Sequence, residues 1–209
     1  MERPLPIRDS DVLKDARLFA SRYHLIKSLS ERLKGKRIAE VGIAFGDFTK
    51  FLLQELDPSH FDAYDIFKLT DSQRMNGVSC ADILKGKTHL EFFNERFESA
   101  IKAGVLRAIP GDSSSNLKNA KVQYDMIYVD GDHSYPGVKR DADVAVNCLA
   151  EDGVLIFNDY TMMDLSGYKY GIVPVVNDLC VNHNWKIFAF AFQPDMFCDI
   201  ALVRGSAAA

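Results

Sequence analysis

Apolar strand-like runs alternate with amphipathic helical stretches along most of the 209-residue chain. Five such runs are interpreted as strands, at about residues 37–42, 61–67, 105–110, 124–130 and 154–158. Strands that alternate with helices usually form a parallel sheet with the helices packed on it, so the pattern predicts an α/β fold. A chain of this length suits one sheet-based domain. We therefore expect residues 1–204 to form a single domain.

Both ends of the chain depart from this alternation. Apolar residues recur every three or four positions over about residues 11–33, which predicts one N-terminal helix capped by Ser10. Two strand-like runs at residues 185–192 and 198–203 are joined by a short connection and predict a hairpin, so one strand runs antiparallel to the others. The tail at residues 205–209 is interpreted as a cloning remnant.

The net charge and the spacing of the cysteines limit which partners and which cellular compartment the protein is expected to have. The formal net charge is −4 without a basic stripe, whereas nucleic-acid binders neutralise phosphates with clustered Lys and Arg. We therefore expect no nucleic-acid partner. No apolar run is long enough to span a membrane, and none of the four cysteines lies in a C-x-x-C pair, which predicts a cytoplasmic protein with reduced thiols and no membrane contact. A homo-oligomer stays an open alternative.

The first predicted strand ends in the loop Glu40-Val41-Gly42-Ile43-Ala44-Phe45-Gly46. Ligands bind outside the carboxyl ends of the strands in open α/β sheets, and glycine lets the backbone approach them closely. The loop lacks the G-x-G-x-x-G pattern that cradles a pyrophosphate, so it predicts a nucleoside ligand without one. A glycine turn that binds nothing is the alternative.

Acids follow the next two strands. Asp65 lies about 20 residues after the glycines, where a carboxylate can accept hydrogen bonds from both ribose hydroxyls. Asp62, earlier in the same strand, is the competing carboxylate and is interpreted as solvated. Asp112, followed by Ser113, ends the third strand and either accepts a hydrogen bond from an adenine amino group or caps the next helix.

The fourth strand ends in Asp130-Gly131-Asp132-His133-Ser134-Tyr135, and the fifth ends in Asn158-Asp159. The carboxyl ends of these strands should meet on one edge of the sheet. Three carboxylates, an amide and an imidazole would then gather there, which is more than turn formation requires. We interpret them as a functional site.

The block from Tyr128 to Tyr135, the turn Asp152-Gly153 and the segment from Gly171 to Pro174 resemble the class I S-adenosylmethionine-dependent methyltransferases. The most similar subgroup is that of the macrocin O-methyltransferase-like enzymes, over about residues 36–204. The resemblance implies a Rossmann-like seven-stranded sheet in the order 3-2-1-4-5-7-6, with strand seven antiparallel and helices on both faces.

The resemblance also implies roles for individual residues. The cofactor-binding residues would be Glu40, Gly42 and Gly46 at the methionine part, Asp65 at the ribose and Asp112 with Ser113 at the adenine, and Asp130 is a further cofactor-binding candidate. Ala44 departs from the pattern, because it stands where the family has its middle glycine. Some relatives bind a divalent cation after strands four and five; here Asp130, Asp159 and Asn158 match, and their oxygens suit Mg²⁺ or Ca²⁺. Metal dependence stays open.

The expected reaction is methyl transfer to a hydroxyl of a small molecule of the sugar or secondary-metabolite type. His133 is the expected general base, because imidazole titrates near neutral pH, and Asp130 is the second catalytic residue. One alternative is a nicotinamide-dependent short-chain reductase, suggested by the Y-x-x-x-K spacing of Tyr135 with Lys139 and of Tyr64 with Lys68. The other is a non-catalytic S-adenosylmethionine-binding protein.

Overall fold

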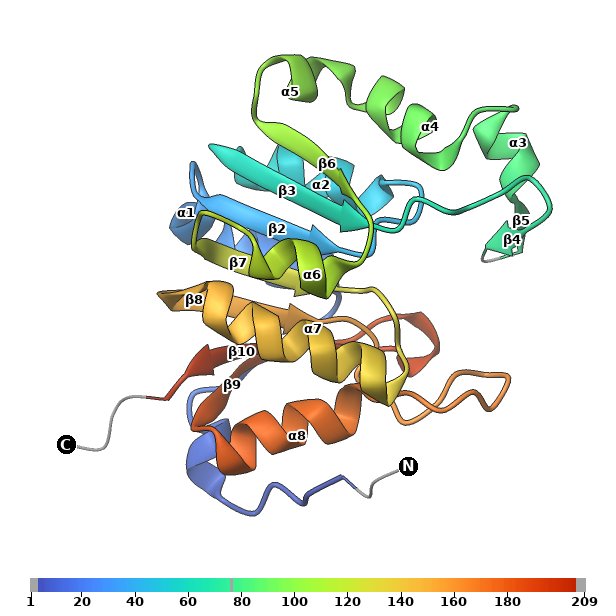
Figure 1. Cartoon of the computed structure of the whole chain (residues 1–209). Helices are drawn as coiled ribbons and strands as arrows, with labels where there is room; N and C mark the ends of the chain where they lie inside the picture. Colours follow the sequence, from blue (N-terminus) through green and yellow to red (C-terminus); the bar gives the residue numbers. More distant parts are fainter. Residues whose placement is uncertain (1–3, 76, 206–209) are drawn as a thin grey trace.

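The computed structural model describes residues 4–75 and 77–205 and contains one large twisted sheet with helices on both faces (Figure 1). The strands of this sheet follow the order β1-β9-β10-β8-β7-β2-β3-β6. Their bounds are β1 Arg17–Phe19, β2 Arg37–Val41, β3 His60–Asp65, β6 Leu106–Pro110, β7 Tyr124–Val129, β8 Leu149–Phe157, β9 Trp185–Ala191 and β10 Asp199–Arg204.

The predicted count of seven strands is wrong, because the described sheet has eight. The additional strand, β1, pairs in parallel with β9 at the edge, so the order of the whole sheet differs from the predicted one there. The other seven strands, followed from β6 to β9, have the predicted neighbours. Strand β10 runs antiparallel to β8 and to β9, which confirms the antiparallel strand expected from the C-terminal hairpin.

The segment expected as one helix over residues 11–33 is divided into three elements. A 3₁₀ turn at Ser10–Leu13 is followed by β1, and helix α1 begins only at Arg22. Asp15 adopts a positive φ of 66°, which an α-helix does not allow, and the Ser21 side chain caps α1 by accepting a hydrogen bond from the His24 amide. The helical periodicity is real, but local backbone geometry interrupts it.

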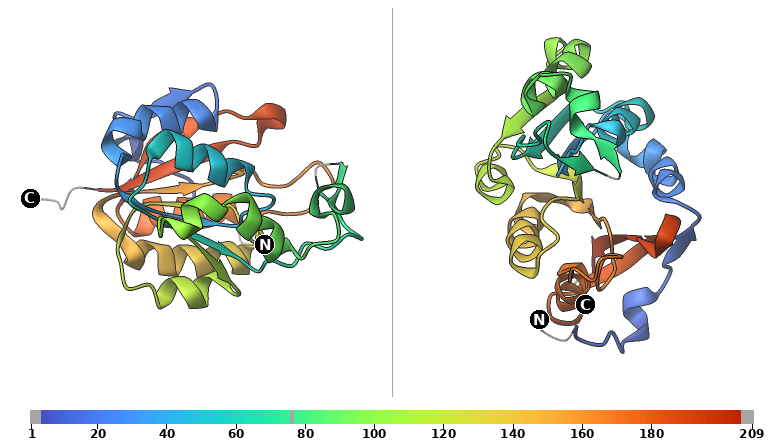
Figure 2. Two further views of the ribbon diagram at one scale, coloured as in Figure 1. Left: turned by 90° about the horizontal axis from the view of Figure 1, so that it is seen from above. Right: turned by 90° about the vertical axis from the view of Figure 1, so that its right-hand side faces the viewer.

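The helices form two layers, one on each face of the sheet (Figure 2). One layer holds α6 Ser113–Lys118, α7 Tyr135–Cys148 and α8 Ile172–Asn182; the other holds α1 Arg22–Leu33, α2 Asp47–Leu56, α4 His89–Arg96 and α5 Glu98–Lys102. Successive residues of a strand face opposite layers, as Ile38 and Ala39 do in β2. Burial on both faces explains why the strands are continuous apolar runs.

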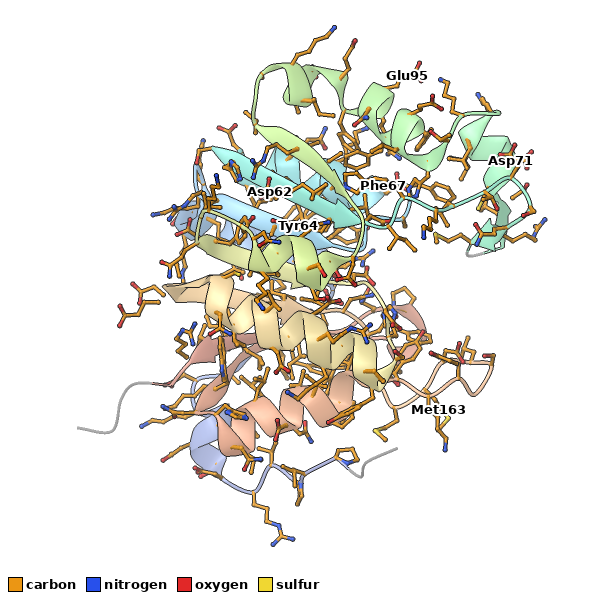
Figure 3. The ribbon with its side chains drawn as sticks, viewed as in Figure 1. Asp62, Tyr64, Phe67, Asp71, Glu95 and Met163 are labelled. Atoms are coloured by element: carbon orange, nitrogen blue, oxygen red, sulfur yellow. The ribbon has the colours of Figure 1, made fainter. Side chains whose placement is uncertain are left out.

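Two segments extend past the carboxyl ends of the parallel strands, and Figure 3 labels Asp71 in one and Met163 in the other. The first holds β4 Arg74–Met75, β5 Val78–Ser79 and α3 Cys80–Leu84. The second is the loop of residues 158–171, which contains an isolated bridge between Met163 and Lys169.

Smaller differences concern the ends of elements. Helices α4 and α5 are separated at Phe97, whose φ of −114° departs from helical geometry. Strand β8 begins at Leu149 rather than near residue 154. Within the described ranges, no helix has both the length and the apolar character to cross a membrane. The expected cloning remnant lies outside the described residues except for Gly205.

Candidate active site

A cavity of about 1480 Å³ opens at the carboxyl ends of β2, β3, β7 and β8. It brings together most of the predicted site residues; those that line it are Glu40, Gly42, Asp65, Asp112, Ser113, Asp130, His133, Asn158 and Asp159. Gly46 does not line the cavity. It precedes α2 with a φ of 81°, and the missing side chain leaves room for the ring of Phe97. Its role is therefore to shape the loop rather than to face a ligand.

The glycine loop is held in place by its neighbours. A Cβ on Gly42 would lie 2.0 Å from the Asp130 carbonyl oxygen, so only glycine lets the two strand ends approach this closely. Ala44, the departure from the family pattern, has a φ of 48°, a conformation that glycine adopts more easily. From α4, His89 donates to the Ala44 carbonyl at 2.5 Å and Arg96 donates to the Phe45 carbonyl at 2.6 Å.

Glu40, the penultimate residue of β2, is a buried carboxyl group and is 2% exposed. Its nearest donor is the Thr49 hydroxyl on α2, at 2.6 Å from Oε2. Burial raises the pKa of Glu40 to about 8, although the Thr49 hydrogen bond acts in the opposite direction. One hydrogen bond is little for a buried acid, and such a group is ready to receive a cationic ligand.

Asp65 and Asp112 occupy the strand ends that the sequence predicts for them. Asp65 accepts amide hydrogen bonds from Ile43 at 2.8 Å and Phe67 at 2.6 Å, which fixes its carboxylate beside the glycine loop. Asp112 caps α6, as one of the two alternatives predicts, and hydrogen bonds from Ser115 and Ser114 lower its pKa. It also lines the cavity, so capping does not remove it from the site.

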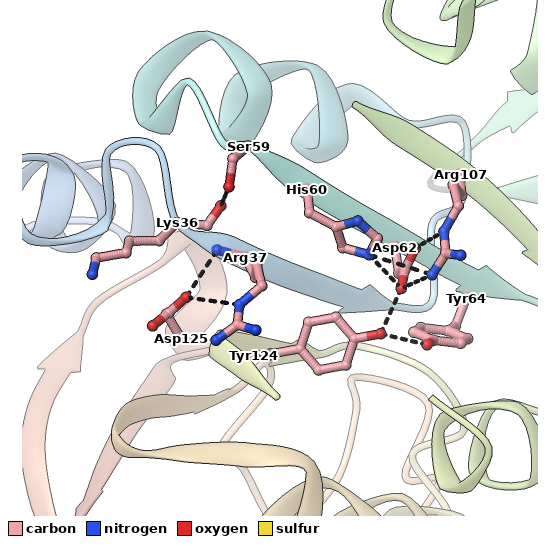
Figure 4. Close-up of polar contacts among 9 residues, drawn as sticks. All are labelled: Lys36, Arg37, Ser59, His60, Asp62, Tyr64, Arg107, Tyr124 and Asp125. Carbon is pink, nitrogen blue, oxygen red and sulfur yellow. Dashed lines mark hydrogen bonds and ion pairs between the residues drawn. The ribbon is translucent and has the colours of Figure 1, made fainter. Parts of the chain in front are cut away.

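The competing acid Asp62 has a different environment from the one expected. It is fully buried rather than solvated, and it accepts hydrogen bonds from Arg107, Tyr124 and His60 (Figure 4). Burial raises the pKa of Asp62, but these bonds outweigh that effect and lower the pKa overall. Asp62 does not line the cavity and belongs to the interior of the sheet.

His133 stands between two carboxylates at the cavity wall. Its Nε2 atom lies 3.6 Å from Asp130 Oδ1 and 3.4 Å from Asp159 Oδ2, and it has no hydrogen-bond partner among the described residues. Burial raises the pKa of Asp130 to about 7, and burial also raises the pKa of Asp159. The ring packs against Tyr170 with centroids 4.6 Å apart. Two carboxylates therefore face the same buried nitrogen of the ring.

The possible metal site at Asp130, Asp159 and Asn158 is not supported by this geometry. Asn158 Nδ2 donates to Asp130 at 2.7 Å, while its Oδ1 accepts from Gln193 at 2.9 Å, so the amide is already engaged on both sides. The His133 ring stands between the two carboxylates that a cation would bridge. In the described part of the chain, no group of three or more His, Cys, Asp or Glu is arranged to hold a metal ion.

Several residues beside the site were not predicted from the sequence. Asp199 of β10 is fully buried and accepts hydrogen bonds from Tyr128 at 2.7 Å and from Gln193. Arg22 of α1 lines the same cavity and donates to Tyr128 at 3.3 Å. An acid within the apolar run of residues 198–203 was a usable signal for Asp199. Arg22 carried no such signal.

With this geometry described, comparison with known proteins identifies the family. A sequence profile of a methyltransferase domain matches residues 39–160, more than half of the chain. The chain belongs to the methyltransferase domain family. Membership implies S-adenosylmethionine as the cofactor. A search of the curated proteins found no match.

Solved structures resemble the methyltransferase fold described above over most of its length. A candidate O-methyltransferase from Klebsiella pneumoniae has a TM-score of 0.64 at 13% identity and covers 97% of this chain and 84% of its own. A candidate rRNA methylase from Clostridium thermocellum has 0.62 at 10%, with 98% and 100% covered. A candidate caffeoyl-CoA O-methyltransferase from Staphylococcus aureus has 0.61 at 16%, with 94% and 88% covered. At these identities the likeness shows the fold alone.

The family assignment overturns the reductase alternative, and the geometry agrees. The Tyr64 hydroxyl is buried against Tyr124 at 2.7 Å, which removes it from the cavity chemistry. Lys139 pairs with Asp143 at 2.5 Å on the outer surface of α7. Neither Y-x-x-x-K pair therefore forms a reductase site in this methyltransferase.

Proposed function

We propose that this methyltransferase transfers the methyl group of S-adenosylmethionine to a hydroxyl oxygen of a small molecule. The observation that carries the proposal is His133 Nε2, which faces two carboxylates and has no hydrogen-bond partner among the described residues. A nitrogen in this position is suited to accept the proton that a hydroxyl must lose when it is methylated.

Different cavity residues would contact successive parts of the cofactor. Asp112 and Ser113 would face the adenine, Asp65 the ribose hydroxyls and Glu40 the methionine end, all of them beside the cavity. The sulfonium of the bound cofactor supplies an electrophilic methyl carbon. The protein's contribution is then to align the acceptor oxygen with that carbon and to exclude water, which is worth several orders of magnitude in rate.

The proton balance assigns a role to each acid beside His133. The acceptor O–H bond breaks, its oxygen bonds to the methyl carbon, and the carbon–sulfur bond breaks to leave S-adenosylhomocysteine. His133 Nε2 takes the proton and later releases it to solvent through the cavity. Asp130 and Asp159, within 4 Å of that nitrogen, would stabilise the imidazolium that forms.

The rim of the cavity supports a small acceptor with an apolar face, such as a sugar derivative or a secondary metabolite. Ile66, Val78 and Leu165 line the cavity and are each about half exposed or more, with Leu165 at 83%. Two of the structural neighbours are candidate O-methyltransferases, which supports oxygen as the acceptor atom. A net charge of −4 favours a small molecule over a nucleic acid.

The test is an assay with methyl-labelled S-adenosylmethionine and a panel of hydroxylated acceptors. Once an acceptor is found, His133→Ala is expected to reduce turnover by about a hundredfold or more while cofactor affinity stays within about threefold. His183→Ala, at an exposed histidine paired with Asp178, is the matched control and should behave as wild type. Unchanged turnover in His133→Ala would remove the base. Cofactor binding without methylation of any acceptor would favour the non-catalytic alternative.

A further inference from the structure

Arg22 is a cation at the cavity that has no role in the methyl transfer proposed above. It is the first residue of α1 and lines the cavity. Its guanidinium lies 4.5 Å from the centre of the Phe48 ring, and one terminal nitrogen donates to the Tyr128 hydroxyl at 3.3 Å. The Nε atom is buried without a hydrogen-bond partner in the part of the chain that the structure describes. The group is thus held in a fixed orientation with donors to spare.

The charges around Arg22 are acids that it does not contact directly. No carboxylate of the described residues lies within ion-pair distance of its guanidinium, although Asp199 and Asp130 are near enough to raise its pKa. Asp199 instead receives its hydrogen bonds from Tyr128 and Gln193. The donors of Arg22 are therefore not consumed by the acids around it.

Arg22 also lies at a particular end of the cavity. Its charge acts on Glu40, near the end of β2, and on Asp130, the residue after β7. The other lysine and arginine that line the cavity within the described ranges are Lys68, three residues after the ribose acid Asp65, and Arg140, whose guanidinium lies 3.9 Å from Asp132. Of these three cations, Arg22 is thus the one at the end of the cavity that Glu40 lines.

The ligand group expected at that end is an α-amino acid, which carries an ammonium and a carboxylate on the same carbon. A site for it needs an acid and a cation side by side, and a guanidinium binds a carboxylate through two parallel hydrogen bonds. We infer that Arg22 binds the α-carboxylate of the methionyl part of S-adenosylmethionine while Glu40 faces its ammonium. The inference rests on the proposed placement of the cofactor.

The test compares two ligands that differ only in this carboxylate, S-adenosylmethionine and its decarboxylated form, by calorimetric titration. Wild type should prefer the carboxylated ligand by about ten- to a hundredfold, in line with a charge-assisted bidentate pair. Arg22→Met should lose that factor for S-adenosylmethionine and change its affinity for the decarboxylated form by less than about threefold. Arg22→Lys, which keeps the charge but not the two-pronged geometry, should lie between them.

Controls separate this role from a structural one. Arg32→Met changes an exposed arginine of the same helix outside the cavity and should leave both affinities unchanged. If Arg22→Met does not fold in a thermal melt, the ligand ratio of Arg22→Lys decides the question. An equal loss for both ligands, or no loss for either, would overturn the inference while the proposed function stands. Failure of wild type to bind S-adenosylmethionine would overturn both.

Discussion

Asp62 and Asp130 are acids of the same parallel sheet, but their surroundings differ. Asp62 accepts hydrogen bonds from Arg107, Tyr124 and His60, which overcome the effect of burial and hold its pKa below the ordinary value. Asp130 accepts one bond, from Asn158, and burial raises its pKa to about 7. The first carboxylate has all its partners within the protein, and the second does not.

The number of hydrogen-bond partners distinguishes an acid that stabilises the fold from an acid of the candidate active site. A buried polar group that the protein satisfies completely stabilises one packing arrangement. An acid with few hydrogen-bond partners and a raised pKa at a cavity is a mark of a functional site. Glu40, with one hydrogen bond from Thr49, belongs with Asp130 in the second class.

The largest loss of stability is expected at Gly42, which packs against the backbone of Asp130. Gly42→Ala would bring a Cβ to 2.0 Å from the Asp130 carbonyl oxygen at a φ of 84°. We expect a loss of about 4 kcal/mol in the free energy of unfolding, from left-handed strain and overpacking together. Gly104→Ala has a similar φ of 74° but open space, and should lose only about 1 kcal/mol in urea unfolding. Equal losses would mean that close approach is not what requires glycine at residue 42.

Replacing Asp62 and Asp130 in turn should change the free energy of unfolding by different amounts. Asp62→Ala leaves Tyr124 and Arg107 without their buried acceptor and should lower the free energy of unfolding by about 3 kcal/mol. Asp130→Asn should change it by less than about 1 kcal/mol, because few bonds are lost, while turnover falls. Chemical denaturation of both variants measures the difference. A larger loss for Asp130→Asn would contradict the division into structural and site acids.

The free energy of unfolding should depend on pH through Glu40. Burial raises the pKa of Glu40 to about 8, so the folded protein keeps a proton that the unfolded chain releases above its ordinary pKa of 4.5. The folded state then binds more protons than the unfolded state, and stability falls as the pH rises through this window. Asp62, with a lowered pKa, contributes a constant stabilisation there, and that contribution is lost only at more acidic pH.

Glu40→Gln isolates this pH effect. The variant should be more stable than wild type by about 1 to 2 kcal/mol near pH 8 and nearly equal to it near pH 5. Thermal unfolding at both pH values, without ligand, measures the change in slope. A wild-type stability that rises over this window, with no change in slope in the variant, would show that Glu40 is ionised in the folded protein.

A smaller effect is expected at Ala44, whose φ of 48° would suit glycine. Ala44→Gly removes that strain but adds flexibility to the unfolded chain, so we expect a gain of at most about 1 kcal/mol in the free energy of unfolding. Ala142→Gly, within α7, is the control and should lose about 1 kcal/mol or more. Destabilisation by Ala44→Gly would indicate that the methyl group packs usefully in the loop.

The smallest expected effect is that of chelation. His133 and the engaged Asn158 amide occupy the surroundings of Asp130 and Asp159, so methyl transfer should be unchanged after dialysis against EDTA. Turnover before and after dialysis, with Mg²⁺ added back, is the measurement. A loss restored by Mg²⁺ would show that the side chains rearrange around a cation.

The sequence by itself determined the α/β class, the antiparallel C-terminal strand and nine of the residues that line the cavity. These features depend on local periodicity and on the rule that parallel strands present their carboxyl ends at one edge. The DGDHSY block and the acids at the strand ends therefore pointed to the edge of the sheet where the cavity lies. The resemblance carried by that block was confirmed at the level of the methyltransferase family.

Only the tertiary structure decided which hydrogen-bond partners each acid has. Two of the three partners of Asp62, Arg107 and Tyr124, lie 45 and 62 residues away from it in the chain, and Arg22 contacts Tyr128 across 106 residues. No local pattern encodes such contacts, so a satisfied carboxylate and an unsatisfied one look alike in sequence. The edge strand β1 has the same origin, because its residues have helical spacing and become a strand only by pairing with β9.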